Sequence, residues 1–77
     1  MVYDRFNEKN ELLLLGNMCN LKVEYAKLSD FFIFLAKKNI STDLNCKLIG
    51  TNFYVSLYFS TKQFAEDAYK KLLQWNP

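Results

Sequence analysis

The alternation of apolar and polar side chains is most regular between residues 44 and 59. Two runs of β-forming residues flank Gly50-Thr51-Asn52 there, which is typical of a β-hairpin. A turn at Gly50-Thr51 and a turn at Thr51-Asn52 leave the same side chains on each face, because strand side chains alternate with a period of two. The apolar face is predicted to join the core and holds Leu44, Cys46, Leu48, Phe53, Val55, Leu57 and Phe59. The mixed face holds Asn45, Lys47, Ile49, Tyr54, Ser56 and Tyr58.

An amphipathic helix is predicted directly after this hairpin. Ser60 or Thr61 is the expected N-cap, since either hydroxyl can accept a hydrogen bond from the first helical turn. Apolar residues then recur at intervals of three and four, which is the helical repeat, until Asn76-Pro77 ends the helix. The predicted buried stripe is Phe64, Ala65, Ala68, Tyr69, Leu72 and Leu73.

A first hairpin is predicted near the amino terminus, between residues 2–6 and 11–16. The polar residues 7–10 separate the two strands, and Gly16-Asn17 ends the second one. Four consecutive leucines fill most of this second strand, so its two faces look alike and its register stays open.

Residues 21–39 permit two interpretations. The preferred one is a long helix that begins at Leu21 with Asn20 as its cap and ends near Asn39; its apolar stripe is Leu21, Tyr25, Leu28, Phe32, Leu35 and Ala36. The alternative is a strand in which Leu21, Val23 and Tyr25 alternate, followed by a shorter helix from Asp30 capped by Ser29.

These elements predict one α+β domain over residues 1–77, in the order ββαββα. Helices on one face of an antiparallel sheet form a two-layer sandwich. The chain has 77 residues, a net charge of +2 and a rich supply of Phe, Tyr and Leu for a core. That charge is too small to indicate nucleic acid binding by itself.

Catalytic and metal-binding chemistry has little support in the sequence. The chain contains no His, which is the usual general base and metal ligand, and its two cysteines do not form a CxxC motif. We therefore expect no enzyme activity, no metal and no cofactor. We also expect a cytoplasmic protein with reduced cysteines, because the first residues are polar and no apolar run approaches the length of a membrane span.

Part of the chain resembles an RNA-recognition motif, over roughly residues 12–73. The stretch 13–18 is similar to the shorter ribonucleoprotein signature of that family, and the stretch 52–59 is similar to the longer one. The family stacks bases on aromatic side chains, but Leu14 and Ser56 occupy two of the stacking positions here and Tyr54 alone retains an aromatic ring. Asn52-Phe53 replaces the basic residue and glycine that open the longer signature.

The resemblance implies a similar scaffold from which most of the RNA chemistry is missing. The family has a strand after its last helix, and this chain does not continue into one. The first strand would fill the vacant edge, which predicts a four-stranded sheet in the order 1-2-4-3 with both helices on one face. In size and style the chain is also similar to small immunity proteins of bacterial toxin systems and to phage-encoded inhibitors.

The open face of the predicted sheet is the candidate binding surface. Its expected partner-binding residues are Tyr54, Tyr58, Lys47, Ser56, Leu14 and Arg5. Tyr and Arg often anchor protein interfaces, so the preferred function is an inhibitor or immunity-type module that occludes a protein partner, such as a toxin or enzyme encoded by a neighbouring gene. The alternatives are a single-stranded RNA- or DNA-binding module, a homodimer joined through this face, and a solvated face with no partner.

The predicted strand order also predicts two free thiols. Cys46 lies on the third strand and Cys19 follows the second, with the fourth strand between them. Two strand spacings amount to about 9.6 Å, whereas a disulfide requires Cα atoms within about 7 Å. Cys46 is expected to be buried and slow to react, and Cys19, placed in a loop before the helix, is expected to react faster.

Overall fold

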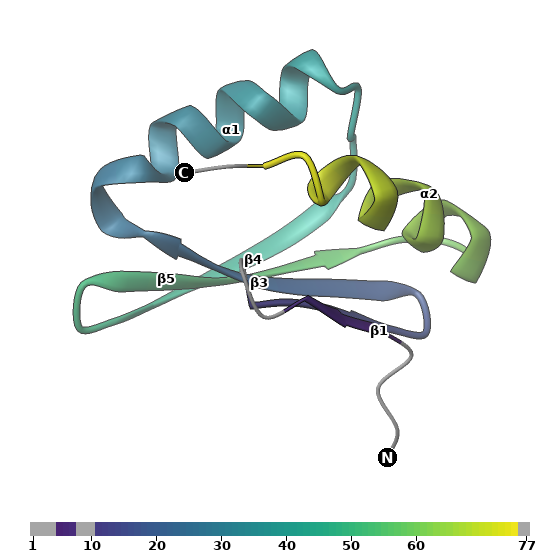
Figure 1. Ribbon diagram of the computed structural model, residues 1–77, viewed down its shortest axis with the longest axis horizontal. Coiled ribbons are helices and arrows are strands. Elements are labelled where there is room, and N and C mark those ends of the chain that lie inside the picture. Colours follow the sequence, from purple (N-terminus) through teal and green to yellow (C-terminus); the bar gives the residue numbers. More distant parts are fainter. Residues whose placement is uncertain (1–4, 8–10, 76–77) are drawn as a thin grey trace.

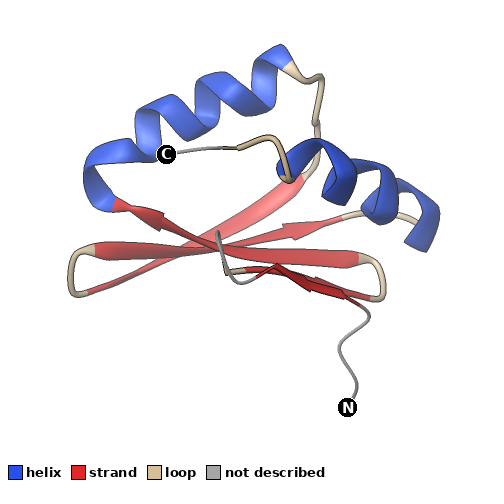
Figure 2. Ribbon diagram, viewed as in Figure 1, coloured by secondary structure: helices blue, strands red, loops and turns tan. Residues whose placement is uncertain are grey.

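The computed structural model describes residues 5–7 and 11–75, in which a five-stranded antiparallel sheet carries two helices on one face (Figure 1). Coloured by secondary structure, the helices form one layer and the strands the other (Figure 2). The elements are β1 (Arg5–Asn7), β2 (Leu12–Leu15), β3 (Met18–Glu24), a short 3₁₀ helix η1 (Tyr25–Lys27), α1 (Leu28–Lys37), β4 (Asp43–Ile49), β5 (Asn52–Tyr58) and α2 (Lys62–Leu72).

The strand order is β1-β2-β3-β5-β4, with every neighbouring pair antiparallel. The four predicted strands correspond to β1, β2, β4 and β5, and their predicted relative order 1-2-4-3 is confirmed. The structure also confirms the α+β class and the position of both helices on one face. The strand count needs correction, because β3 inserts between β2 and β5 and the element order is βββαββα.

The long helix predicted from Leu21 is wrong, since residues 18–24 form the central strand β3. Cys19, Leu21 and Val23 are all buried, so apolar side chains alternate here with the period of a strand. Gly16, at φ +56°, lies in the tight turn that reverses the chain between β2 and β3, a conformation that glycine adopts without strain. The alternative interpretation was closer, although α1 begins at Leu28 rather than Asp30 and Ser29 is not its cap.

The helix ends agree better with the predictions. Asn39, at φ +57°, follows the end of α1, and the amide of Ile40 donates to the carbonyl of Leu35 at 2.9 Å, as in a Schellman motif. Of the two candidate caps for α2, Thr61 is the one used: its hydroxyl accepts from the Phe64 amide at 3.1 Å. The second hairpin turns at Gly50-Thr51, because Ile49 pairs with Asn52.

The core lies between the helices and β2, β3 and β5. Trp75 closes one end of it, packed against the rings of Phe31 and Phe34 at centroid distances of 5.3 Å. The fully buried larger side chains are Phe31, Leu12, Leu14, Leu57, Leu72, Val23, Val55 and Cys19.

Some side chains predicted to lie in the core are exposed. Leu44 and Leu48 do share the helix-facing side of the sheet, but β4 is at its edge and their side chains are 40% and 51% exposed. On the helices Phe32, Ala36, Phe64 and Leu73 are also exposed, because the buried stripes are narrower than the helical repeat alone indicated.

Candidate binding face

The side of the sheet opposite the helices carries most of the predicted binding residues. We call it the open face. On β5 the alternating residues Tyr54, Ser56 and Tyr58 lie on it, and Lys47 on β4 is the direct cross-strand partner of Tyr54. Tyr54 and Tyr58 are 42% and 44% exposed. The structure therefore brings four of the six predicted residues together.

Leu14 is not part of this surface. It pairs with Cys19 and is completely buried beneath the helices, as is Leu12, so the predicted placement of Leu14 is wrong. The open face instead receives Leu13 and Leu15, which are partly exposed. The backbone of Arg5 pairs with that of Leu14, but the Arg5 side chain lies outside the described residues.

Cross-strand pairs extend the open face across four strands. Leu13 faces Asn20, which faces Ser56, which faces Asn45; the next row runs from Lys22 through Tyr54 to Lys47. Over the described strands the face consists of Leu13, Leu15, Met18, Asn20, Lys22, Glu24, Asp43, Asn45, Lys47, Ile49, Asn52, Tyr54, Ser56 and Tyr58.

A hollow of about 340 Å³ lies on this face. Lining residues include Leu13, Asn20, Lys22, Tyr54 and Ser56, with Glu11 at its margin. Sequence reasoning missed Asn20 and Lys22 because it took Asn20 as the cap of the long helix predicted from Leu21 and included Lys22 in that helix. The alternation of the apolar Cys19, Leu21 and Val23 with polar residues in the sequence was the signal that could have placed Asn20 and Lys22 on a strand.

The charges on the open face nearly balance. Lys22 forms an ion pair with Glu11, and this hydrogen bond to the carboxylate raises the pKa of the Lys22 ammonium above its usual value. Lys47 lies on the same face together with the carboxylates of Glu24 and Asp43. Among its described residues the open face and its margin thus carry two ammonium groups and three carboxylates, so this surface is not basic.

Asn20 contributes a polar atom that lacks a partner. Its Oδ1 is buried and accepts no hydrogen bond from any described group. An unsatisfied buried acceptor costs roughly 1–3 kcal/mol relative to a satisfied one. A donor from a bound molecule that reached this atom would recover part of that energy.

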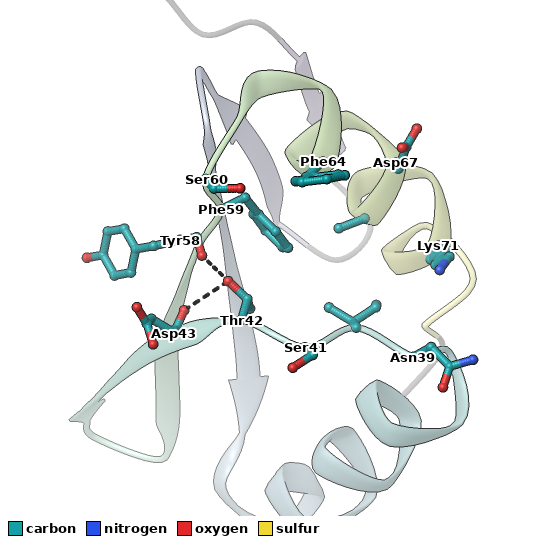
Figure 3. Close-up of a pocket in the computed structure, with 12 residues that line it drawn as sticks. Asn39, Ser41, Thr42, Asp43, Tyr58, Phe59, Ser60, Phe64, Asp67 and Lys71 are labelled. Carbon is teal, nitrogen blue, oxygen red and sulfur yellow. Dashed lines mark hydrogen bonds between the residues drawn. The ribbon is translucent and has the colours of Figure 1, made fainter.

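A larger hollow of about 630 Å³ lies on the other side of the molecule, between the α1–β4 connection, the end of β5 and α2 (Figure 3). Thr42 already donates to the Tyr58 carbonyl, and the Lys71 ammonium donates to the Lys38 carbonyl at 2.9 Å. Asp67 points away from the hollow and accepts from Gln63. The side chains of Thr42, Asp67 and Lys71 therefore already have partners within the chain.

The cysteine environments reverse the predicted order of reactivity. Both thiols are free, as expected. However, Cys19 is completely buried on β3, where its Sγ lies 3.5 Å from the Ala65 carbonyl oxygen and burial raises its pKa to about 12. Cys46 is only partly buried on the edge strand, so it is the more accessible thiol.

Over residues 5–7 and 11–75 no three His, Cys, Asp or Glu side chains are grouped in a way that could hold a metal ion. None of the described helices combines the length and the apolar character needed to cross a bilayer.

The two stretches that resemble ribonucleoprotein signatures lie mostly on strands that are not neighbours. Residues 13–15 are on β2 and residues 52–58 on β5, with β3 between them, and of the strand residues in the first stretch only Met18, the first residue of β3, pairs with the second stretch, at Tyr58. Comparison of the chain with protein-family models, with curated proteins and with solved structures finds no match in any of the three.

Proposed function

We propose that this protein is a non-enzymatic protein-binding module of the inhibitor or immunity type, which occludes a protein partner with its open face. The observation that carries the proposal is the presence of two half-exposed tyrosines on a face whose charges nearly balance. Tyr54 and Tyr58 are on β5, an interior strand. The same face carries the exposed Ile49 of the neighbouring strand β4 and, beyond β3, the partly exposed Leu13 and Leu15 of β2. Tyrosine beside apolar side chains is typical of the centre of protein interfaces.

The hollow beside Tyr54 supplies a site for an anchoring side chain. Leu13 and Tyr54 give it apolar walls, whereas Asn20 brings an acceptor without a partner. An arginine, lysine or amide side chain of the partner would fit this combination, because it can bury its aliphatic part and donate to Asn20. The partner is therefore expected to insert a donor-bearing side chain here.

Nucleic acid is the less favoured class of partner. Binding to phosphates gains most of its free energy from several Lys or Arg side chains on one surface. Lys22 is paired with Glu11, which leaves Lys47 as the unpaired ammonium among the described residues of the open face. We propose the cytoplasm as the place of action, where Cys19 and Cys46 would remain reduced.

A capture experiment tests the proposal. The purified wild-type protein, a Tyr54→Ala/Tyr58→Ala variant and a Tyr25→Ala variant are used as bait in lysate from the source organism. Tyr25 is a matched control: it is also exposed, at 63%, but stacks on Phe53 on the helix-facing side of the sheet. A protein retained by wild type and by Tyr25→Ala, but lost from the double variant, supports the open face as the interface.

Fluorescence of the buried Trp75 shows whether each variant is folded. A partner that binds the folded double variant as well as wild type would refute the assignment of the open face. Fluorescence anisotropy with mixed-sequence single-stranded oligonucleotides at low salt separates the two classes of partner. Binding that falls steeply with added salt and depends on Tyr54 would replace the protein partner by a nucleic acid.

A further inference from the structure

The strand β4 is an open edge of the sheet. It pairs with β5 without interruption from Asp43 to Ile49, and no described strand pairs with its other side. The opposite edge of the sheet, β1, has three residues, whereas β4 has seven. A long edge strand without proline or a bulge presents a row of free amide and carbonyl groups to another strand.

The hydrogen bonds of β5 show which residues of β4 present those groups. The Tyr25 amide donates to the Thr51 carbonyl, and the Phe59 amide donates to the Asn17 carbonyl. In an antiparallel ladder the backbone groups of successive residues point to opposite sides, so odd-numbered residues of β5 bond to β3 and even-numbered residues bond to β4. The even-numbered residues pair with Asp43, Asn45, Lys47 and Ile49. The backbone groups of Leu44, Cys46 and Leu48 therefore point outward.

The same three residues carry an uncovered apolar stripe. They are opposite Leu57, Val55 and Phe53, so their side chains share the helix-facing side of the sheet. Leu44 and Leu48 are nevertheless 40% and 51% exposed, and Cys46 is partly exposed. Free backbone groups and apolar side chains thus coincide at Leu44, Cys46 and Leu48, in a pattern that reads the same in both directions.

We propose that β4 pairs antiparallel with β4 of a second copy of this chain, about a two-fold axis at Cys46. In this register Cys46 faces Cys46 of the second copy, and each Leu44 faces the Leu48 of the other. All three outward residues then form hydrogen-bonded pairs, and the two apolar stripes lie side by side. Shifting the two strands by two residues would leave Leu44 or Leu48 without an apolar counterpart.

Charges on the open face agree with this register. Lys47 of one copy is diagonal to Asp43 of the other, which gives two attractive diagonals against a single Lys47–Lys47 diagonal. The two-fold axis is perpendicular to the sheet, so both helix layers lie on the same side of a continuous sheet. The open face stays free on the other side, and the inference is therefore independent of the proposed function.

Charge substitutions test the register directly. Analytical ultracentrifugation from micromolar to millimolar concentration is expected to show a monomer–dimer equilibrium for wild type. Leu44→Asp and Leu48→Lys should each weaken the dimer by about tenfold or more, because each change occurs at two contacts of a symmetric pair. An equimolar mixture of the two variants should restore association, since the carboxylate introduced in one copy then faces the ammonium introduced in the other. Leu73→Lys, at an equally exposed leucine of the helix layer, is the matched control and should leave the dimer unchanged.

Cross-linking through Cys46 provides a second readout. A short bis-maleimide should join two wild-type chains, should fail with Cys46→Ser and should be much less efficient with Leu48→Lys. A wild-type protein that stays monomeric at millimolar concentration would overturn the inference. The partner of the β4 edge would then be a strand of another protein. A dimer that Leu48→Lys does not weaken, or that the mixture does not restore, would overturn it as well.

Discussion

Substitution of neighbouring leucines on β2 tests which face of the sheet is buried. Leu14 is fully buried beneath the helices, whereas Leu13 lies on the open face and is partly exposed. The two residues are adjacent, of the same type and in the same strand, so intrinsic strand propensity cancels in the comparison. The expected result is a large loss of stability for Leu14→Ala and a small one for Leu13→Ala.

The magnitude follows from burial. Truncation of a fully buried leucine to alanine costs about 2–5 kcal/mol, because both the transfer free energy and a cavity are involved. A partly exposed leucine is expected to cost about 1 kcal/mol or less. A domain of 77 residues has a free energy of unfolding of roughly 4–12 kcal/mol, so Leu14→Ala removes a large share of it.

Urea unfolding followed by tryptophan fluorescence is the suitable assay, since Trp75 is the single tryptophan and is buried against Phe31. With an m-value near 1 kcal/mol/M, the midpoint of Leu14→Ala should fall by about 2–3 M relative to Leu13→Ala. If Leu14→Ala does not fold, the two leucines can be replaced by valine instead. Leu14→Val should lower the free energy of unfolding by about 1 kcal/mol and Leu13→Val should hardly change it. Equal losses, or a larger loss at Leu13, would show that β2 faces the other way.

Three further predictions concern individual groups. In the native protein at pH 8, Ellman's reagent should modify Cys46 well before Cys19. The pKa of Cys19 is raised from 9.0 to about 12, so its thiolate fraction is about 10³-fold below that of an ordinary cysteine. Equal rates for the two thiols would contradict the burial of Cys19. Between these two pKa values the unfolded chain releases a thiol proton that the folded chain keeps, so the free energy of unfolding should fall as the pH rises above 9, and the decline should be smaller in Cys19→Ala. Thr61→Ala should lower the free energy of unfolding, measured in urea, by about 1 kcal/mol because the α2 cap is lost, whereas Ser60→Ala should hardly change it. A larger loss for Ser60→Ala than for Thr61→Ala would identify Ser60 as the cap.

The second half of the fold could be predicted from the sequence because each signal there is local. Gly50, a regular alternation on both sides of it and a threonine before an amphipathic repeat define the hairpin and α2 without reference to other parts of the chain. The placement of Tyr54, Ser56 and Tyr58 on one face follows from the same alternation.

The strand β3 was missed because its sequence satisfies two periods at once. Leu21, Tyr25 and Leu28 match a helix, whereas Cys19, Leu21 and Val23 match a strand. The choice depends on β5, which offers an edge to which β3 pairs over its whole length. Such a pairing joins residues far apart in the chain, so the local pattern alone does not decide between the two periods.

Which leucines of β2 enter the core could not be predicted from the sequence either. Four leucines in succession present apolar side chains in either orientation, so only the pairing of Leu14 with Cys19 decides which of them enter the core. The error at Leu14 and the omission of Asn20 from the candidate face both follow from the missing strand.

The position of Trp75 at one end of the core has a consequence for folding during translation. Phe31 and Phe34 leave the ribosome some forty residues before the tryptophan that covers them, an interval of about 2–9 s at typical rates of translation. The bond from Lys38 to Gln74 and the bond from Lys71 to the Lys38 carbonyl also wait for this last segment. During synthesis Phe31 and Phe34 therefore remain without this aromatic partner until Trp75 has emerged and can pack against them.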